Sequence, residues 1–198
     1  MISCPEPYDQ LYESDCPFVI MRSGRNAGKS RNTADYIVYQ STQAINEDIV
    51  LCRDSYSDMA DSMYASIIKA IEEQGLEMFY QFKKQPLRII CTLTNCNIYF
   101  MGIGGADKSR TKSFEPINPK VRLYVFEELQ QVREQENLEQ ALASFRRHLS
   151  SQGKFLFLFN PPPQNSNWVN LWCSSKKYDK DYLIIDSSWL DIVEYLND

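Results

Sequence analysis

Residues 18–30, with the sequence F-V-I-M-R-S-G-R-N-A-G-K-S, limit the possible folds more than any other part of the chain. The stretch starts with a short apolar run, continues through small residues and closes on Gly28-Lys29-Ser30. A segment with helical spacing, residues 31–44, follows it. A strand, a small-residue turn and a helix in this order form the context of a phosphate-binding P-loop. The stretch therefore predicts a nucleotide site.

Each residue type in this loop has a physical role at a phosphate group. Consecutive backbone N–H groups surround an anion, and the following helix adds its free N-terminal donors. Gly28 lets the backbone approach the phosphates because it has no Cβ. We expect Lys29 to reach the β- and γ-phosphates and the Ser30 hydroxyl to ligate Mg²⁺. The expected nucleotide-binding residues are Ser23, Gly24, Arg25, Asn26, Ala27, Gly28, Lys29 and Ser30.

The loop departs from the full pattern G-x-x-x-x-G-K-[ST] at one position. Ser23 stands where the pattern has its first glycine, and Gly24 comes one residue late. Serine is small, so the turn is retained if Ser23 has a negative φ. The alternative interpretation is an ordinary strand–helix turn with a surface lysine.

The composition narrows the class of protein. The 198 residues are 43% hydrophobic, which is enough for a core, and we expect 1–198 to form a single domain. The net charge of −5 argues against a broad basic face that grips duplex DNA. The cysteines form no C-x-x-C motif, so no zinc site is expected and a reducing, cytosolic compartment fits. No signal peptide and no membrane-spanning run is visible in the sequence.

Residues 1–17 are rich in proline and acidic residues, which favours an irregular N-terminal arm. The arm contains Tyr8, Gln10 and Tyr12. One interpretation is an adenine clamp, in which a ring stacks on the base or the glutamine reads its edge. The other is a terminus without a fixed structure.

Strand-like and helix-like segments alternate along the rest of the chain. The main expected helices cover residues 31–44, 55–74 and 134–149, with short ones at 168–175 and 188–196. Residues 87–94 and 97–103 flank a turn and predict a β-hairpin. Four expected strands are unbroken apolar runs, which implies burial on both faces and a parallel sheet. The expected fold is α/β, with a mainly parallel central sheet flanked by helices and a β-hairpin insert.

A hydrolytic nucleotide site also needs a carboxylate near Mg²⁺ and a group that orients the attacking water. The strand expected at 121–126 runs into Glu127 and Glu128. We expect this strand next to the P-loop strand, because ligands bind at the carboxyl edge of an open sheet. We assign Glu127 to the Mg²⁺ shell and Glu128 to the water. Glu127 stands where aspartate is usual, and the alternative is a solvated helix cap.

Asn160 follows the apolar run 154–159 and precedes three prolines. An amide at this point can bond both a γ-phosphate oxygen and the lytic water, which would distinguish ATP from ADP. The alternative is a plain Asn-Pro turn.

An arginine is expected to offset charge at the transferring phosphate. Arg25 lies inside the loop and would act in cis. The other candidates are Arg22, Arg53, Arg146 and Arg147. The sequence does not decide among them. The polar segment 106–119 is either a solvated connection or a mobile loop that contacts nucleic acid or a neighbouring subunit.

Five blocks, taken in order, resemble a known family. They are S-G-R-N-A-G-K-S, the strand ending in Arg53 with D-S-M-Y behind it, I-Y-F-M-G-I-G-G-A-D-K-S-R-T-K-S, Y-V-F-E-E-L, and F-L-F-L-F-N-P-P with Trp168 behind it. Each block alone is a weak signal, but their order and spacing over residues 17–168 are specific. The chain resembles the large terminase subunit of tailed bacteriophages, in its N-terminal packaging ATPase domain.

The resemblance implies an ASCE-type, RecA-like P-loop fold that uses ATP and Mg²⁺ to move double-stranded viral DNA into a procapsid. It implies catalytic roles for Lys29, Arg25, Glu128 and Asn160, and metal ligation by Ser30 and Glu127. The implied partners are viral DNA, the portal protein, the small terminase subunit and further copies in a ring on the capsid. The implied location is the cytoplasm of the infected bacterium, with transient docking on the portal. The family's nuclease domain is expected to be absent.

Two other classes of function fit parts of the sequence. One is another P-loop NTPase, either helicase-like or a small-molecule kinase, although no second RecA-like domain and no arginine-rich lid is visible. The other is a non-catalytic nucleotide-binding assembly module, which glutamate in place of aspartate at Glu127 would favour.

Overall fold

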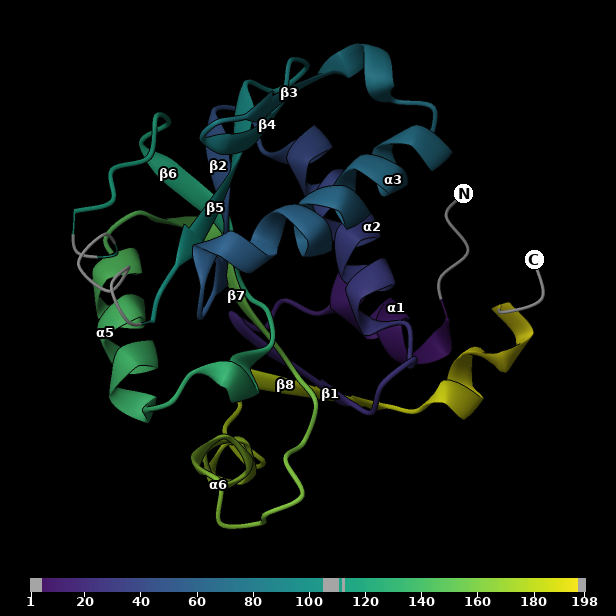
Figure 1. The fold of residues 1–198 in the computed structure, drawn as a ribbon, viewed down its shortest axis with the longest axis vertical. Coiled ribbons are helices and arrows are strands. Elements are labelled where there is room, and N and C mark those ends of the chain that lie inside the picture. Colours follow the sequence, from purple (N-terminus) through teal and green to yellow (C-terminus); the bar gives the residue numbers. More distant parts are fainter. Residues whose placement is uncertain (1–4, 105–110, 112, 196–198) are drawn as a thin grey trace.

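The structure is a computed structural model that describes residues 5–104, 111 and 113–195. Within these residues the chain forms an eight-stranded sheet with the order β3-β4-β5-β2-β6-β7-β1-β8 (Figure 1). The strands are β1 (Phe18–Ser23), β2 (Glu47–Arg53), β3 (Tyr80–Lys84), β4 (Leu87–Cys91), β5 (Cys96–Gly102), β6 (Lys120–Phe126), β7 (Leu149–Phe159) and β8 (Tyr182–Ser187). All neighbouring pairs from β5 to β8 are parallel, and β4 pairs antiparallel with β3 and β5. The expected mainly parallel sheet and the β4–β5 hairpin are confirmed.

Helices cover both faces of this sheet. On one face lie α1 (Glu6–Glu13), α2 (Lys29–Gln43) and α3 (Ala65–Glu73), and on the other lie α5 (Gln135–Phe145) and α6 (Trp168–Ser175) (Figure 1). Short non-α segments are Tyr56–Met59, Ala60–Tyr64, Glu77–Phe79, Leu129–Gln131 and Trp189–Tyr195. No helix in the described part of the chain is both long and apolar enough to cross a membrane.

Successive residues of the central strands pack against opposite helical layers, as the two-residue period of a strand requires. In β6, Leu123 and Val125 face the layer of α1 to α3, whereas Tyr124 and Phe126 face α5 and α6. The second side is rich in stacked rings, and Tyr124 lies with its ring centroid 4.5 Å from that of Phe145. Burial on both faces fixes the carboxyl ends of the parallel strands, where the candidate site lies.

The N-terminal arm is not irregular in its described part, so that prediction is wrong. Residues Glu6–Glu13 form α1, with Pro7 in the first turn, where a missing N–H costs nothing. Tyr8 and Leu11, one helical turn apart, are completely buried. The proline and acidic residues that suggested an arm are those that helix N-termini tolerate or favour.

The segment expected as one helix at 55–74 is broken. A 3₁₀ turn and a π turn precede α3, and Ser62 has the non-helical dihedrals φ −115° and ψ −107°. The helix expected at 134–149 ends at Phe145, and β7 begins at Leu149 rather than at residue 154. The terminal segment is a 3₁₀ helix. Much of the polar loop 106–119 lies outside the described residues.

The acidic strand β6 is not next to the P-loop strand β1, which corrects a second prediction. The strand between them is β7, which pairs in parallel with both. Strand order depends on contacts between distant segments, so local pattern could not show it. As a result, the residue that follows β7, Asn160, lies between the P-loop and the two glutamates.

Candidate nucleotide site

The P-loop has the backbone geometry of a phosphate cradle. Strand β1 ends at Ser23, and α2 begins at Lys29 after Gly28, whose φ of 74° and ψ of 0° are left-handed. The left-handed conformation favours glycine, and a Cβ here would also crowd Asn32 Nδ2 at 3.1 Å and Ile192 Cδ1 at 3.4 Å. Ser23 is not among the residues with positive φ, as the turn needs.

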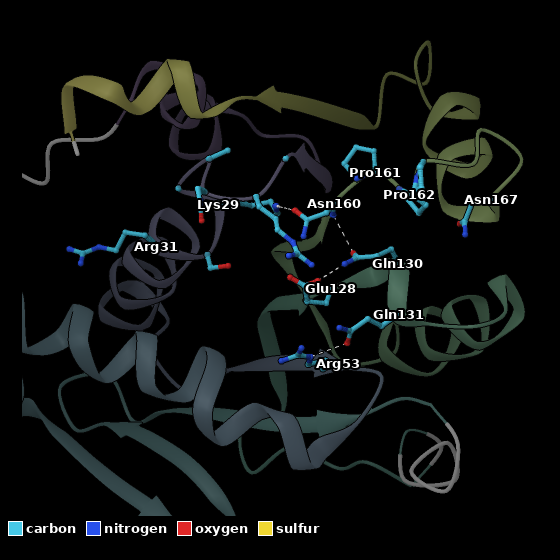
Figure 2. A pocket seen from close by; sticks show the side chains of 17 residues that line it. Lys29, Arg31, Arg53, Glu128, Gln130, Gln131, Asn160, Pro161, Pro162 and Asn167 are labelled. Atoms are coloured by element: carbon cyan, nitrogen blue, oxygen red, sulfur yellow. Dashed lines mark hydrogen bonds between the residues drawn. The ribbon is translucent and has the colours of Figure 1, made fainter. Parts of the chain in front are cut away.

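A cleft of about 1040 Å³ opens over this loop (Figure 2). Its lining comes from the P-loop, the ends of β2, β6 and β7, and the segment after β7. The lining residues are Gly24, Arg25, Asn26, Ala27, Gly28, Lys29, Ser30, Arg31, Arg53, Glu128, Gln130, Gln131, Asn160, Pro161, Pro162, Pro163 and Asn167. Most of the residues expected at a nucleotide site therefore meet in one cleft. Ser23 and Glu127 are not part of its lining.

Lys29 is held at the floor of the cleft. Its Nζ donates to Ser23 Oγ at 2.9 Å and to Asn160 Oδ1 at 2.8 Å, and only 7% of the residue is exposed. Burial lowers the pKa of Lys29, while the carboxylates of Glu128 and Glu127 raise it. Both hydrogen-bond acceptors are neutral, so the ammonium group is available to a phosphate anion in the cleft.

Glu128 enters the cleft through an unusual backbone conformation. Its φ of 51° and ψ of 45° are left-handed, which is uncommon for a residue with a side chain. The chain then turns through the 3₁₀ segment Leu129–Gln131, and Leu129 anchors it by complete burial. The Glu128 carboxylate accepts a hydrogen bond from Gln130 Nε2. This reversal lets two consecutive glutamates point in different directions.

Glu127 turns toward the α3 side of the site. It is 5% exposed, its Oε2 lies 3.3 Å from Ser62 Oγ, and Arg53 Nη1 lies 3.7 Å from the same oxygen. Burial raises the pKa of Glu127 to about 7, with a smaller rise from Glu128 and an opposing effect of Arg53. The arginine thus compensates this carboxylate only in part, and a second cation would stabilise its charged form.

Gln130 is a residue of the site that the sequence did not reveal. Its Oε1 accepts from the backbone N–H of Asn160 at 3.2 Å, while its Nε2 donates to Glu128. Figure 2 shows the resulting chain of contacts from Lys29 through Asn160 and Gln130 to Glu128. The sequence offers only one signal for Gln130, its place two residues after the paired glutamates.

The candidate arginines divide into two groups. Arg25 and Arg53 line the cleft, and Arg53 Nε also donates to Gln131 Oε1 at 3.2 Å. Arg22 pairs with Asp186 at 2.6 Å, on the side of β8. Arg146 packs over the Phe18 ring, and Arg147 pairs with Glu115 at 3.6 Å. Within one copy of the chain, only the first group is placed to meet a nucleotide in this cleft.

The residues weighed as an adenine clamp lie elsewhere. Tyr8 is fully buried, and its hydroxyl contacts the carbonyl oxygen of Ala27 and, at 2.7 Å, Ser187 Oγ. The Tyr12 ring packs edge-on against Tyr36, with ring centroids 5.1 Å apart. Gln10 is exposed, and none of the three lines the cleft. α1 instead supports the P-loop from beneath, so stacking on a base is not its role in this arrangement.

The described residues contain no group of three His, Cys, Asp or Glu side chains that could hold a metal ion. Mg²⁺ at nucleotide sites needs few protein ligands, because phosphates and water supply the rest. Ser30 lines the cleft at the start of α2, and the incompletely compensated Glu127 carboxylate lies at the end of β6. The residues present therefore fit a magnesium ion that arrives with its nucleotide.

The parallel sheet, the loop between β1 and α2 and the polar ends of β6 and β7 define a P-loop NTPase fold of the RecA-like type. A family model described as phage terminase large subunit matches residues 17–198. The chain belongs to the phage terminase large subunit family. No curated protein sequence matches it.

Solved structures agree with this family. The large terminase of a thermophilic bacteriophage is 15% identical, with a TM-score of 0.77, and the match covers 96% of this chain and 47% of that one. The HK97 bacteriophage large terminase is 14% identical, with a TM-score of 0.71, covering 93% of this chain and 39% of that one. The large terminase ATPase domain of a Thermus phage is 12% identical, with a TM-score of 0.68, and the match covers 98% of this chain and 86% of that one. The chain thus spans less than half the length of each of the first two proteins and has their fold.

Proposed function

We propose that this chain is the ATPase motor domain that couples ATP hydrolysis to translocation of double-stranded viral DNA into a procapsid. The observation that carries the proposal is the cleft in which the buried Lys29 ammonium, Asn160 and Glu128 meet beside the P-loop. Family membership supplies the biological setting. The thermophilic phage large terminase has been solved with ADP and with ATP-γ-S, which supports ATP as the nucleotide.

The P-loop residues would hold the phosphates, with Lys29 placed against the β- and γ-phosphates and Arg25 offsetting charge on the transferring group. Ser30 and Glu127 would hold Mg²⁺, Glu127 directly or through water. When bound, this ion would neutralise phosphate charge and orient the γ-phosphate. Glu127 stands outside the cleft lining, beside Arg53 and Ser62, which fits a ligand acting through water better than one in direct contact.

Glu128 would act as the general base that takes a proton from the attacking water. Its carboxylate reaches the cleft because of the left-handed backbone at that residue. Asn160 would bond a γ-phosphate oxygen and the water, and its side-chain oxygen already bonds Lys29. Loss of the γ-phosphate would therefore change the contacts of Asn160 at the end of β7, and movement coupled to hydrolysis would start there.

The partners implied by the family belong to the same proposal: viral double-stranded DNA, the portal protein, the small terminase subunit and further copies in a ring on the capsid. The site would operate in the cytoplasm of the infected bacterium, while the ring is docked on the portal. Residues 1–198 would act as one ATPase domain. With a net charge of −5, the chain alone has no strong electrostatic drive to associate, so light scattering should give mainly monomer without portal or DNA.

The test measures phosphate release from ATP, with and without double-stranded DNA. It compares the wild-type chain with two single variants, in each of which one lysine is replaced by alanine. Lys29→Ala should abolish release, and Lys69→Ala, whose side chain is 69% exposed on α3, should leave it unchanged. ATP binding without Lys29-dependent release would indicate a non-catalytic assembly module instead. Stimulation by single-stranded nucleic acid or transfer to a small acceptor would indicate the helicase-like or kinase alternatives.

A further inference from the structure

Beyond the expected nucleotide-site residues, one side chain joins the ends of two strands. Gln130 contacts the Glu128 carboxylate through Nε2 and the Asn160 backbone N–H through Oε1, at 3.2 Å for the second contact (Figure 2). Glu128 follows β6 and Asn160 follows β7. Gln130 is thus the link between the residue expected to activate water and the segment expected to sense the γ-phosphate.

Chemistry fixes the orientation of this amide. A carboxylate can only accept, so it requires the NH₂ group of Gln130, and a backbone N–H can only donate, so it requires the carbonyl oxygen. Rotating the amide by 180° would place two acceptors together on one side and two donors on the other. Both contacts are satisfied in one orientation only, which makes the bridge a specific one.

The backbone around Gln130 is held on both sides. Leu129 and Val132 are each 1% exposed and anchor the turn in the core on the α5 side. The adjacent Gln131 uses its side chain differently, since its Oε1 accepts from Arg53 Nε at 3.2 Å. Of these two neighbouring glutamines, Gln131 therefore contacts the end of β2, whereas Gln130 contacts Glu128, the expected general base.

We propose that Gln130 is a positioning residue that holds the Glu128 carboxylate and couples it to Asn160. This inference rests on the proposed function and adds a residue to it. Gln130 acts through Glu128 and takes no proton itself. A hydrogen bond to a charged group contributes on the order of 1.5–3 kcal/mol, which corresponds to about 10- to 100-fold in rate if it is needed in the transition state.

The first test is single-turnover hydrolysis by Gln130→Met, which keeps the length of the side chain and removes both contacts. We expect the single-turnover rate constant, and kcat in the steady state, to fall about 10- to 100-fold, with the steady-state KM for ATP within about twofold of wild type and an unchanged unfolding temperature. Gln130→Glu keeps the acceptor for Asn160 but puts a second carboxylate beside Glu128, so its kcat should fall at least as far. Gln140→Met, at an exposed position on α5, is the matched control.

A double-mutant cycle separates positioning from a general structural effect. If Gln130 acts through Glu128, Gln130→Met should change the residual rate little in a Glu128→Gln background. A full additional loss there would mean that Gln130 acts independently, and the inference would be overturned. The contact itself is read by NMR, where Glu128→Gln should shift the side-chain amide signals of Gln130 and leave those of Gln140 in place.

The inference and the proposed function can fail separately. Wild-type kcat in Gln130→Met, in a chain whose hydrolysis depends on Lys29, would overturn only the role of Gln130. Absence of Lys29-dependent hydrolysis in the wild-type chain would overturn the proposed function. Even in that case, the NMR comparison would still test the contact between Gln130 and Glu128. Side-chain amide signals of Gln130 that do not change in Glu128→Gln would show that the contact is absent, and signals that shift would support it.

Discussion

Glu127 and Glu128 have the same side chain and adjacent positions, but the end of β6 places them in two different environments. Glu127 is buried against Arg53 and Ser62, on the side of α3. Glu128 lies in the cleft and contacts Gln130. The first environment restrains the carboxylate, and Arg53 compensates part of its negative charge. The second environment leaves the carboxylate accessible to water and to a ligand in the cleft.

The backbone causes this difference. Residue 127 continues the direction of the strand, and its N–H bonds the carbonyl oxygen of Cys52 at 2.8 Å. Residue 128 is left-handed, and the buried Leu129 then draws the chain back into the core. A pair of identical residues can therefore be divided between two tasks by one unusual dihedral pair, without any difference in side-chain chemistry.

The largest expected effect comes from removing the charge of Lys29, which interacts electrostatically with both carboxylates. Lys29→Met keeps the packing of the buried side chain and loses the ammonium group, so hydrolysis should fall by about 10³-fold or more. The fold should remain, as circular dichroism would show. Turnover close to wild type would contradict the nucleotide site itself and make the comparison of the two glutamates irrelevant.

A smaller effect isolates the cleft side of the comparison. Glu128→Gln retains size and hydrogen bonding but loses the charge that we propose activates water, so single-turnover hydrolysis should fall by at least ~10²-fold. Binding of ATP should be retained. The exposed Glu139 on α5 provides the control variant Glu139→Gln. A Glu128→Gln rate within a few-fold of wild type would move the role of general base to another group.

The smallest expected effect concerns the covered side. Ser62 Oγ lies 2.9 Å from the carbonyl oxygen of Asp58 and 3.3 Å from Glu127 Oε2, and one hydroxyl hydrogen can serve only one of them at a time. Ser62→Ala should therefore lower the free energy of unfolding by about 1 kcal/mol or less and change turnover by less than about threefold. Urea unfolding measures the first quantity, with the exposed Ser151→Ala as control. A tenfold loss of turnover in a stable Ser62→Ala chain would place Ser62 in the chemistry.

The sequence was sufficient for the parts of the site that depend on local pattern. A P-loop needs glycine, lysine and a hydroxyl at fixed spacing between a strand and a helix, so local pattern is enough to predict residues 23–30 as this loop. The structure has the expected strand before the loop and the expected helix after it. Continuous apolar runs likewise indicate buried parallel strands, and the hairpin shows its own turn. These features are determined by residues close together in the chain.

The parts that failed depend on distant contacts. Nothing local shows that β7 separates β1 from β6, because strand order is decided by the packing of whole elements. Residues 56–73 contain no proline or glycine, so the break at Ser62 has no sequence signal. Helix α1 is short and acquires its stability from burying Tyr8 and Leu11 under the P-loop rather than from its own propensity. Gln130 has a partner thirty residues away in Asn160.

The most direct test of the division between the two glutamates is a titration of ATP against Glu127→Gln and Glu128→Gln, each with and without Mg²⁺. The expected result is that Glu128→Gln keeps the full gain in ATP affinity that Mg²⁺ gives the wild-type chain. Glu127→Gln should lose most of that gain, because it removes a charge from the proposed metal shell. The reverse pattern would exchange the two roles. An unchanged gain in both variants would mean that the end of β6 does not hold the metal.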